Sequence, residues 1–559
     1  MSTARILSAA ALLLTSTLTS GPVVAGDAMV LTNARIYTVD AERSRAEAMA
    51  IDESGVILAV GSNEEIVGTY GTGIDLKDRM VLPGFQDAHL HAVEAGITAN
   101  FCLLPQFGSK ADYEQALTDC ADELSDRSWV IGAGVNMAAL LDSLEDPLGL
   151  IDSIIEDRPA VILDDLGHGA WANTQALAAA GFDSLTQDPR GGILVRMEDG
   201  SLTGVVLESA SQTLMDVSQP PTPENLDFAL KSLSGAMEIL AANGITSVSD
   251  AGGYWPRGHE TVWERAEAEE ILTVRASNAL YLYPNFPLDR QIKELKKRYS
   301  NDPARLVRFN QVKIYLDGIL SQATGLLYAP YEASLGLAPE ENRGFAYFTH
   351  EDLFRYATEL SAAGFQLHFH ATGDRGTGLA LDTIEQADAT SGPHRITHLY
   401  MIAPKDRPRF RDLGVVADFQ LAPSSVGSSY RESIAEFIGG RAGDLMPLRA
   451  LHDAGALITL SSDWDADELS PLVKLQTVLT RDREGAPNLA AAIEMMTINP
   501  ARLLRHADRT GSIEPGKFAD LVILDRDLFE VSPAEMSEVQ IEATLLQGEA
   551  VFDPTGLLE

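Results

Sequence analysis

The sequence predicts an α/β protein built on a (β/α)8 barrel of the TIM type. We expect a small β-sandwich formed by both termini and an inserted domain after the first barrel strand. Three observations lead to this fold class. Eight short apolar runs alternate with helical patterns, which favours a closed parallel sheet. Both ends of the chain instead carry short alternating runs. The length of 559 residues is too great for one compact core.

The barrel is assigned to residues 83–505, with a first strand that begins slightly earlier. Extra apolar runs at 129–134 and 160–164 fall between the first two strands, so residues from about 100 to 240 are interpreted as an insertion that could form part of a substrate pocket. A proline-rich turn at 219–224 precedes a helix that starts near Asn225. The predicted strands are 81–89, 245–250, 272–277, 311–317, 366–370, 395–398, 415–420 and 457–463.

The composite sandwich is assigned to residues 26–82 and 506–559. Residues 1–25 have the pattern of a secretory signal peptide: Arg5, an apolar run from Ile6 to Leu18, and small residues before a cleavage site. The run is too short to span a bilayer, and we expect an exported protein, periplasmic or secreted. Such a compartment permits a disulfide between the two cysteines, Cys102 and Cys120, although two buried thiols fit the sequence equally well.

The composition restricts the partners. Hydrophobic residues make up 45% and charged residues 22%, which is ordinary for a globular protein. Acidic residues outnumber basic ones 81 to 42, and the net charge is −39. Because this field repels nucleic acid and anionic membranes, we expect neither as a partner. A small-molecule substrate is expected, and a homodimer is compatible with the sequence.

Histidines and an aspartate end several predicted strands. His89 and His91 are two residues apart, so both rings can point to one side of the strand. His370 and His398 end two later strands, and Asp463 ends the last. By itself, a histidine that ends a strand, such as His398, is usually structural, and an aspartate such as Asp463 usually caps the next helix. Together they would meet at the C-terminal face of a barrel, where neutral imidazole can bind zinc.

Two further residues of these strands have alternative interpretations. His368 would lie one layer deeper than His370, and is expected to support the site or the core. Lys313 stands inside an apolar strand, where an unpaired amine is costly. Its spacing favours pairing with a buried carboxylate such as Asp317. The alternative is carbamylation by carbon dioxide, which would create an anionic metal ligand.

Several of these motifs together resemble the amidohydrolase superfamily, and more narrowly amidohydrolase family 3, which includes N-substituted formamide deformylase. The likeness covers nearly all of the chain after the leader, in family order. The matching segments are Pro-Gly-Phe-Gln-Asp-Ala-His-Leu-His at 83–91, Val-Lys-Ile-Tyr-Leu-Asp-Gly at 312–318, His-Ala-Thr-Gly-Asp at 370–374, Thr-His at 397–398, Ser-Asp-Trp at 462–464 and the tail at 511–522.

The resemblance implies a site and a reaction. One or two divalent metal ions, with zinc expected, would be held by His89, His91, carbamylated Lys313, His370, His398 and Asp463. Asp463 would also act as general base, and His398 would steady the oxyanion if one metal were absent. The substrate would contact His168, Asn173, Glu208, Asp374 and Trp464. For His168, Asn173 and Glu208 a purely structural role in the insertion fits the sequence equally well, and Asp374 could instead cap a helix.

The implied activity is hydrolysis of a non-peptide carbon–nitrogen bond, such as an amide, by metal-activated water. Two alternatives remain at this stage. The same fold could hydrolyse lactones, cyclic amides or esters, or the protein could be an exported binding protein without catalysis. The chain also departs from the family after Trp464, where Asp-Ala-Asp-Glu replaces the usual proline and apolar residue. This change alters the wall beside Asp463.

Overall fold

A parallel barrel forms the centre of the molecule. The computed structural model describes residues 28–332, 342–389, 392–481 and 483–559, so the proposed leader lies outside the described residues. Within those ranges eight parallel strands form one sheet that begins with β8 and runs through to β21. The strands are β8 (Phe85–Leu90), β15 (Ile245–Asp250), β16 (Arg275–Tyr281), β17 (Val307–Tyr315), β18 (Gln366–Ala371), β19 (Arg395–His398), β20 (Val416–Phe419) and β21 (Ile458–Leu460).

The two ends of this sheet meet between β8 and β21. The backbone N–H of Asp463 donates to the carbonyl of His89 over 2.8 Å. Buried apolar side chains lie between the strands and the surrounding helices. These helices are α8 (Pro223–Ala242), α9 (His259–Ala268), α10 (Leu288–Arg298), α11 (His350–Ala362), α12 (Asp374–Gln386), α13 (Arg407–Leu413), α16 (Leu448–Asp453) and α17 (Pro471–Thr480). The predicted barrel is therefore confirmed.

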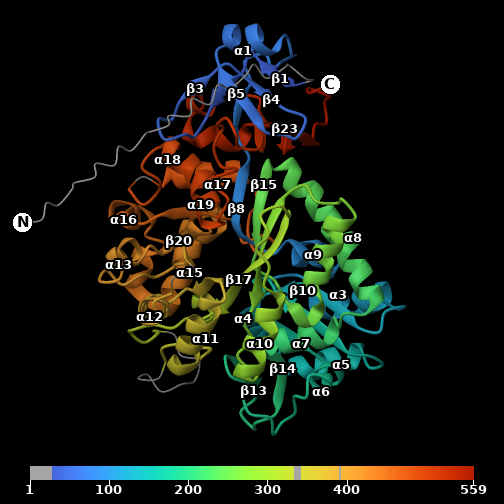
Figure 1. The fold of residues 1–559 in the computed structure, drawn as a ribbon. Helices are drawn as coiled ribbons and strands as arrows, with labels where there is room; N and C mark the ends of the chain where they lie inside the picture. Colours follow the sequence, from blue (N-terminus) through green and yellow to red (C-terminus); the bar gives the residue numbers. More distant parts are fainter. Residues whose placement is uncertain (1–27, 333–341, 390–391, 482) are drawn as a thin grey trace, which may run out of the picture.

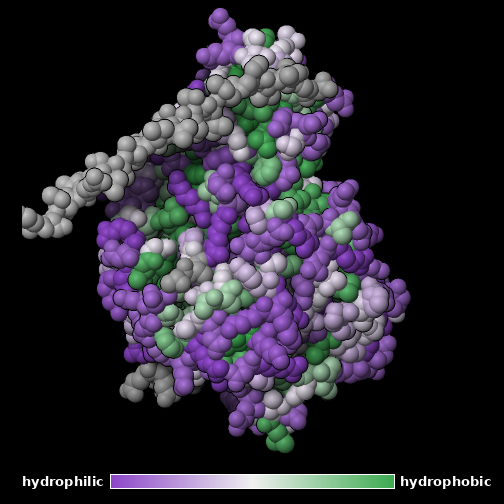
Figure 2. All heavy atoms as spheres, viewed as in Figure 1, coloured by the Kyte–Doolittle hydropathy of each residue, from purple (hydrophilic) through white to green (hydrophobic). Residues whose placement is uncertain are grey.

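Both chain ends contribute to a sandwich at one end of the barrel, at the top of Figure 1. One sheet holds β1 (Met29–Thr32), β4 (Ala48–Ile51), β5 (Ile57–Gly61) and β6 (Ile74–Asp75). In the second, β7 (Met80–Pro83) lies between β2 (Arg35–Tyr37) and the C-terminal β22 (Leu521–Leu524), with β3 (Arg45–Ala46), β23 (Ile541–Leu546) and β24 (Glu549–Phe552) outside them. Hydrophilic residues cover most of the barrel face shown in Figure 2, and hydrophobic residues gather below the sandwich tip.

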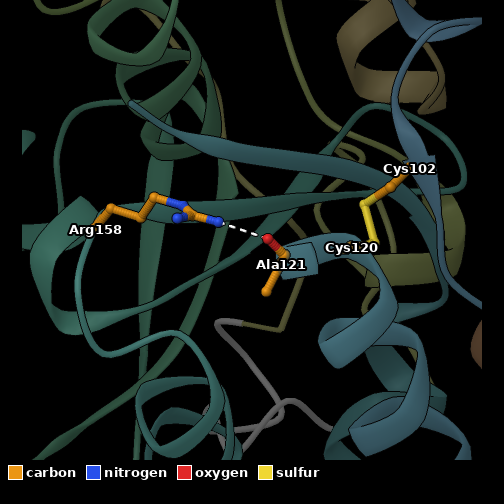
Figure 3. The surroundings of a disulfide bond; sticks show 4 residues. All are labelled: Cys102, Cys120, Ala121 and Arg158. Atoms are coloured by element: carbon orange, nitrogen blue, oxygen red, sulfur yellow. Dashed lines mark hydrogen bonds between the residues drawn. A yellow bond between two sulfur atoms is a disulfide. The ribbon is translucent and has the colours of Figure 1, made fainter. Parts of the chain in front are cut away.

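The chain between β8 and α8 forms an inserted sheet, which lies at the opposite end of the barrel from the sandwich (Figure 1). Its strands are β9 (Cys102–Leu103), β10 (Val130–Val135), β11 (Ala160–Asp164), β12 (Gly169–Ala172), β13 (Gly192–Arg196) and β14 (Leu202–Glu208). Cys102 and Cys120 form a disulfide between β9 and α3 (Lys110–Glu123), close to the hydrogen bond from Arg158 to the Ala121 carbonyl (Figure 3). Of the two states left open for the cysteines, the structure has the disulfide.

Some predicted boundaries differ from the structure. The predicted run 81–89 is two strands, because the chain crosses from the sandwich to the barrel at Gly84. The third barrel strand was placed too early, since β16 starts only at Arg275. The helix of 223–242, α8, which the predicted insertion of about 100–240 includes, packs on the barrel beside α2 (Ala92–Thr98). Among the described residues, no helix combines the length and apolar character needed to cross a membrane.

Candidate metal centre

Two histidines of the first barrel strand meet the aspartate that follows the last. Nε2 of His89 lies 3.0 Å from Oδ1 of Asp463, and Nε2 of His91 lies 3.4 Å from the same oxygen. One ligand atom from each of the three residues lies within 4.8 Å of the others, a spacing that one metal ion can bridge. The rings of His89 and His91 thus lie on one side of the strand, as its alternation predicts.

Two more histidines complete this group. His370 lies in β18 and His398 ends β19, and their ring centroids are 4.3 Å apart. The His398 ring is 5.0 Å from the His89 ring, and its Nδ1 is 3.6 Å from Oδ2 of Asp463. All five side chains that the sequence singled out as strand ends therefore lie together at the C-terminal end of the barrel.

Two ring nitrogens in this group have no hydrogen-bond partner among the residues that the structure describes. Nε2 of His370 donates to the Gly318 carbonyl over 3.3 Å, which leaves Nδ1 as a bare acceptor, and that atom is buried without a partner. Nε2 of His398 is also buried and unpaired. Burial lowers the pKa of both histidines, for His398 to about 3, so both rings are neutral. Unpaired, neutral imidazole nitrogens are the ligand form for a divalent cation, so the residues present fit a metal.

Deeper residues orient the first histidine. Nδ1 of His89 lies 2.8 Å from Nε2 of His368, which points the other ring nitrogen toward Asp463. The carboxylate of Asp87 accepts the backbone N–H of His89 over 3.0 Å and that of Ser462 over 3.1 Å. Asp87 thus joins the first and last barrel strands directly below the site.

The backbone adopts an uncommon conformation at three of the predicted site residues. Glu208, His398 and Asp463 have φ angles of 58°, 73° and 59°, in the left-handed region. Each such residue costs on the order of 1–3 kcal/mol and persists where the surroundings hold it. Here the backbone N–H of each one is hydrogen-bonded: Glu208 to the His168 carbonyl, His398 to the Gln420 side chain, and Asp463 to the His89 carbonyl.

Lys313 is fully buried beside the histidines, with its Nζ 3.0 Å from Nε2 of His89. Burial lowers the pKa of Lys313 to about 7. The expected pairing with Asp317 is wrong, because the Asp317 carboxylate accepts three backbone N–H groups instead. The donors are Leu326, Thr372 and Gly373, at 2.8 to 3.0 Å. The amine therefore faces the metal ligands and not the carboxylate.

The Asp463 carboxylate is held in its charged form. Burial by itself would raise the pKa of Asp463, but the electrostatic influence of the neighbouring His89 and His398 rings and the hydrogen bonds from His89 and His91 hold it well below its usual value. A carboxylate that stays ionised among histidines can bind a cation and accept a proton from a neighbouring water.

His168 belongs to a second network beside the site. Its Nδ1 is 2.6 Å from the buried Glu208 carboxylate, which also accepts the hydroxyls of Thr324 and Tyr347. Burial alone lowers the pKa of His168, but the Glu208 charge raises it above its usual value overall. The His168 ring lies 5.4 Å from the His370 ring and 5.8 Å from the Tyr315 ring. This network joins the insertion to the barrel.

A cavity of about 220 Å³ opens above these residues, between the barrel and the inserted sheet. Four of the predicted site residues line it: His91, His168, His398 and Asp463. The insertion contributes Leu103, Ala133 and the segment 163–168 to its wall. The expectation that the insertion forms part of the pocket agrees with this arrangement.

The Amidohydrolase family model matches residues 72–552, which is most of the chain. The chain belongs to this family. It is 28% identical over 551 residues to Protein LONG AFTER FAR-RED 3 of Arabidopsis thaliana, covering 94% of this chain and 91% of that protein. It is 26% identical over 552 residues to N-substituted formamide deformylase of Arthrobacter pascens, covering 94% and 99%.

A solved structure shows the same fold. The structure of an uncharacterized metal-dependent hydrolase from Pyrococcus horikoshii aligns with a TM-score of 0.70 at 24% identity, covering 90% of this chain and 99% of that one. The amidohydrolase fold, with a barrel, a composite sandwich and an insertion, is thereby confirmed for this chain.

Three residues that the resemblance assigns to the substrate lie differently in this amidohydrolase. The Asn173 side chain caps α6 (Thr174–Ala179) and bonds the backbone of residues 155, 158 and 160, so it is not brought to the cavity. Asp374 begins α12 and accepts the backbone N–H of Tyr328. Trp464 is not among the cavity residues; its carbonyl accepts the His91 N–H over 2.6 Å.

Sequence reasoning also missed residues that support this amidohydrolase site. Asp87 is two residues before His89 and shares its face, so alternation could have identified it. Tyr315 shares a face with Lys313 in the same way, and its ring stacks on His370 at 4.2 Å. Tyr347, which donates to Glu208, lies in a loop where no periodic pattern gives a position.

Proposed function

We propose that this amidohydrolase hydrolyses the carbon–nitrogen bond of a small non-peptide amide and uses one or two zinc ions. The observation that carries the proposal is the convergence of His89, His91, His370, His398 and Asp463, with two buried ring nitrogens lacking a protein partner. The name of the Arthrobacter relative, N-substituted formamide deformylase, supports an amide as the substrate class.

The histidines and Asp463 would hold the cation, and Lys313 would join them if it is carbamylated. A bound divalent cation polarises a carbonyl and lowers the pKa of water. Asp463 is placed to accept a proton from the attacking water as the bond between water oxygen and carbonyl carbon forms. When the carbon–nitrogen bond breaks, Asp463 returns that proton to the leaving nitrogen, so that a carboxylic acid and an amine are released. His398 lies beside the same carboxylate, and with one metal absent it would be placed to donate to the oxyanion.

Metal analysis and a substrate panel test this proposal together. Purified protein is analysed for metal, stripped with a chelator and reconstituted with zinc, and each form is assayed on N-formyl and N-acetyl amines, lactones, cyclic amides and esters. We expect amide hydrolysis that disappears on stripping and returns with zinc. Hydrolysis of lactones or esters alone would favour the alternative substrates. Absence of both metal and turnover would favour a binding protein.

The chemical state of Lys313 and the number of bound metal ions can be observed directly by crystallography. We propose carbamylation because Nζ lies at the ligand cluster and Asp317 does not pair with it. A crystal structure with anomalous data at the zinc edge tests both points. Density for a plain amine at Lys313 in a fully metallated crystal would contradict the carbamylation.

We also propose that the protein is exported. The leader-like pattern of residues 1–25 and the disulfide between Cys102 and Cys120 support this location. Cell fractionation with sequencing of the mature N-terminus tests it. Full-length protein in the cytoplasm would contradict the proposal.

A further inference from the structure

We propose that the catalytic cavity selects substrates whose part remote from the scissile bond is neutral or positively charged, and excludes those that carry a carboxylate or phosphate there. This inference rests on the proposed hydrolysis and names the substrate class of the same site. It comes from the charges of the cavity wall.

Carboxylates dominate the wall. Besides Asp463, the cavity is lined by Glu94, Asp164, Asp165 and Asp465. No lysine or arginine is among the residues lining this cavity in the part of the chain that the structure describes. The titratable nitrogen bases of the wall are His91, His168 and His398, and all three lie at the catalytic end.

Two of the charges on and behind the wall are balanced locally. The Glu94 carboxylate accepts Nη1 of the buried Arg257 over 2.8 Å. Positive charge on His168 is offset by Glu208, 2.6 Å away. Each of these pairs therefore presents little net charge to a ligand in the cavity.

Asp165 is not balanced in this way. It accepts hydrogen bonds from the neutral amides of Gln106 and Asn136, and it forms no ion pair with a lysine or arginine within the described ranges. Asp465 stands two residues after Asp463 and interacts with His91, so it belongs to the catalytic end. The uncompensated charge of Asp165 therefore faces a cavity of about 220 Å³, where it repels an anionic group and attracts a cationic one.

An independent observation fixes which end of the cavity reacts. His398 lines the same cavity, its side chain is more than nine-tenths buried, and its Nε2 has no hydrogen-bond partner among the described residues. The other end is formed by the insertion, where Leu103 and Leu166 are 74% and 39% exposed. Asp165 is next to Leu166, so its charge lies among apolar contacts remote from the metal ligands. This end suits an apolar group or an apolar cation.

A matched substrate series provides the test. N-benzylformamides with a para tert-butyl, trimethylammonium or carboxylate group have similar sizes and different charges. At low salt we expect kcat/KM for the cationic substrate to exceed that for the anionic one by about 100-fold, and added salt to narrow the gap. Equal rates, or faster hydrolysis of the carboxylate, would overturn the inference.

Binding provides a readout that does not depend on turnover. The same three compounds are titrated calorimetrically into the Asp463→Asn variant, and the carboxylate is expected to bind weakest. If no formamide is hydrolysed by the wild-type protein but this order of binding holds, the proposed reaction fails while the charge selection stands. If all are hydrolysed at equal rates and bind equally, the charge selection fails while the reaction stands.

A variant identifies the responsible charge. The substitution Asp165→Asn is expected to reduce the cation-to-anion ratio of kcat/KM about tenfold, because the uncompensated charge is gone. Glu42→Gln is the matched control, since it also removes one negative charge, from an exposed site in the sandwich. A control that changes the ratio as much as Asp165→Asn would assign the selectivity to the overall charge of −39 and overturn the local origin.

Discussion

Asp463 combines a left-handed backbone position with a carboxylate that lies 3.0 to 3.6 Å from ring nitrogens of three histidines. Asparagine tolerates the same backbone region and has nearly the same shape. Replacing Asp463 by asparagine therefore removes the proton acceptor while the surrounding fold is kept. The histidines can still hold a cation.

We predict that Asp463→Asn lowers kcat by about 10²–10⁴-fold and retains bound metal. The measurements are turnover of the preferred amide and metal content of the purified variant. Asp374→Asn is the control, because Asp374 accepts a backbone N–H outside the cavity. Turnover of the Asp463 variant at the wild-type rate would rule out the general-base assignment.

At this scale, strand alternation predicted part of the site. His89 and His91 share a side, and His368 lies deeper and supports His89, because the period of two determines which face a side chain occupies. The role of Asn173 was harder to predict from the sequence. It directly precedes a helix, where an asparagine caps the first turn, and the resemblance did not distinguish this use from substrate contact.

Single elements were predicted well where the pattern was periodic and poorly where the chain passed between units. The ranges 245–250 and 395–398 match β15 and β19. The run 81–89 was predicted as one strand because apolar residues occur on both sides of Gly84. A Cβ at Gly84 would meet the Thr246 side chain at 2.3 Å, so the crossing to the barrel depends on this glycine.

His394, just before β19, gives the fold a pH dependence. Its Nδ1 accepts the Leu367 N–H over 2.9 Å, and burial lowers the pKa of His394 to about 4. Because the unfolded chain has a pKa near 6.5, the unfolded state binds more protons between these values. Stability is therefore constant with respect to this group above pH 6.5 and falls as the pH drops toward 4.

We predict that His394→Gln flattens this dependence, because the glutamine carbonyl can accept the same N–H without titrating. The unfolding free energy of wild-type protein is measured in denaturant from pH 7 to pH 4.5 and compared with that of the variant. His452→Gln, at an exposed position, is the control. Parallel curves for wild type and the His394 variant would show that another group governs the acid loss.

The disulfide stabilises the insertion by linking β9 to α3. For a loop of this size the expected contribution is about 3 kcal/mol. We predict that the double variant Cys102→Ala with Cys120→Ala unfolds at a lower temperature than the oxidised wild type. Adding reductant should lower the wild type to a similar value and leave the variant unchanged. A variant as stable as the oxidised wild type would contradict this assignment.

Across the whole molecule, one buried ion pair connects the sandwich to the barrel. Nε of Arg275, the first residue of β16, lies 2.9 Å from the Asp520 carboxylate, and both side chains are buried. We predict that Asp520→Ala lowers the unfolding free energy by roughly 3–5 kcal/mol, because it leaves a buried guanidinium without its partner. Urea unfolding measures this change.

The control is Asp289→Ala, which breaks the exposed ion pair with Arg355. We expect little change there, because exposed pairs are screened by solvent. Equal losses in the two variants would show that burial of the Arg275–Asp520 pair has no special weight.

The overall architecture followed from the sequence because each unit has its own periodicity. The alternating flanks, the eight runs and the additional runs between the first two strands indicated the sandwich, the barrel and the insertion. The shape of the cavity did not follow, because it depends on how the insertion lies against the barrel. Asp165 and Leu166, for example, are in a loop whose position is set by contacts distant in sequence.

The pairing of β7 with β22 has a consequence for biosynthesis. While the chain leaves the ribosome, β7 exposes an unsatisfied edge until its partner, near the far end of the protein, has been translated. Nascent protein therefore carries an open template for association with other chains throughout most of its synthesis. Premature stop codons that remove β22 should yield aggregates and not a smaller working enzyme, even though every catalytic side chain would already be present.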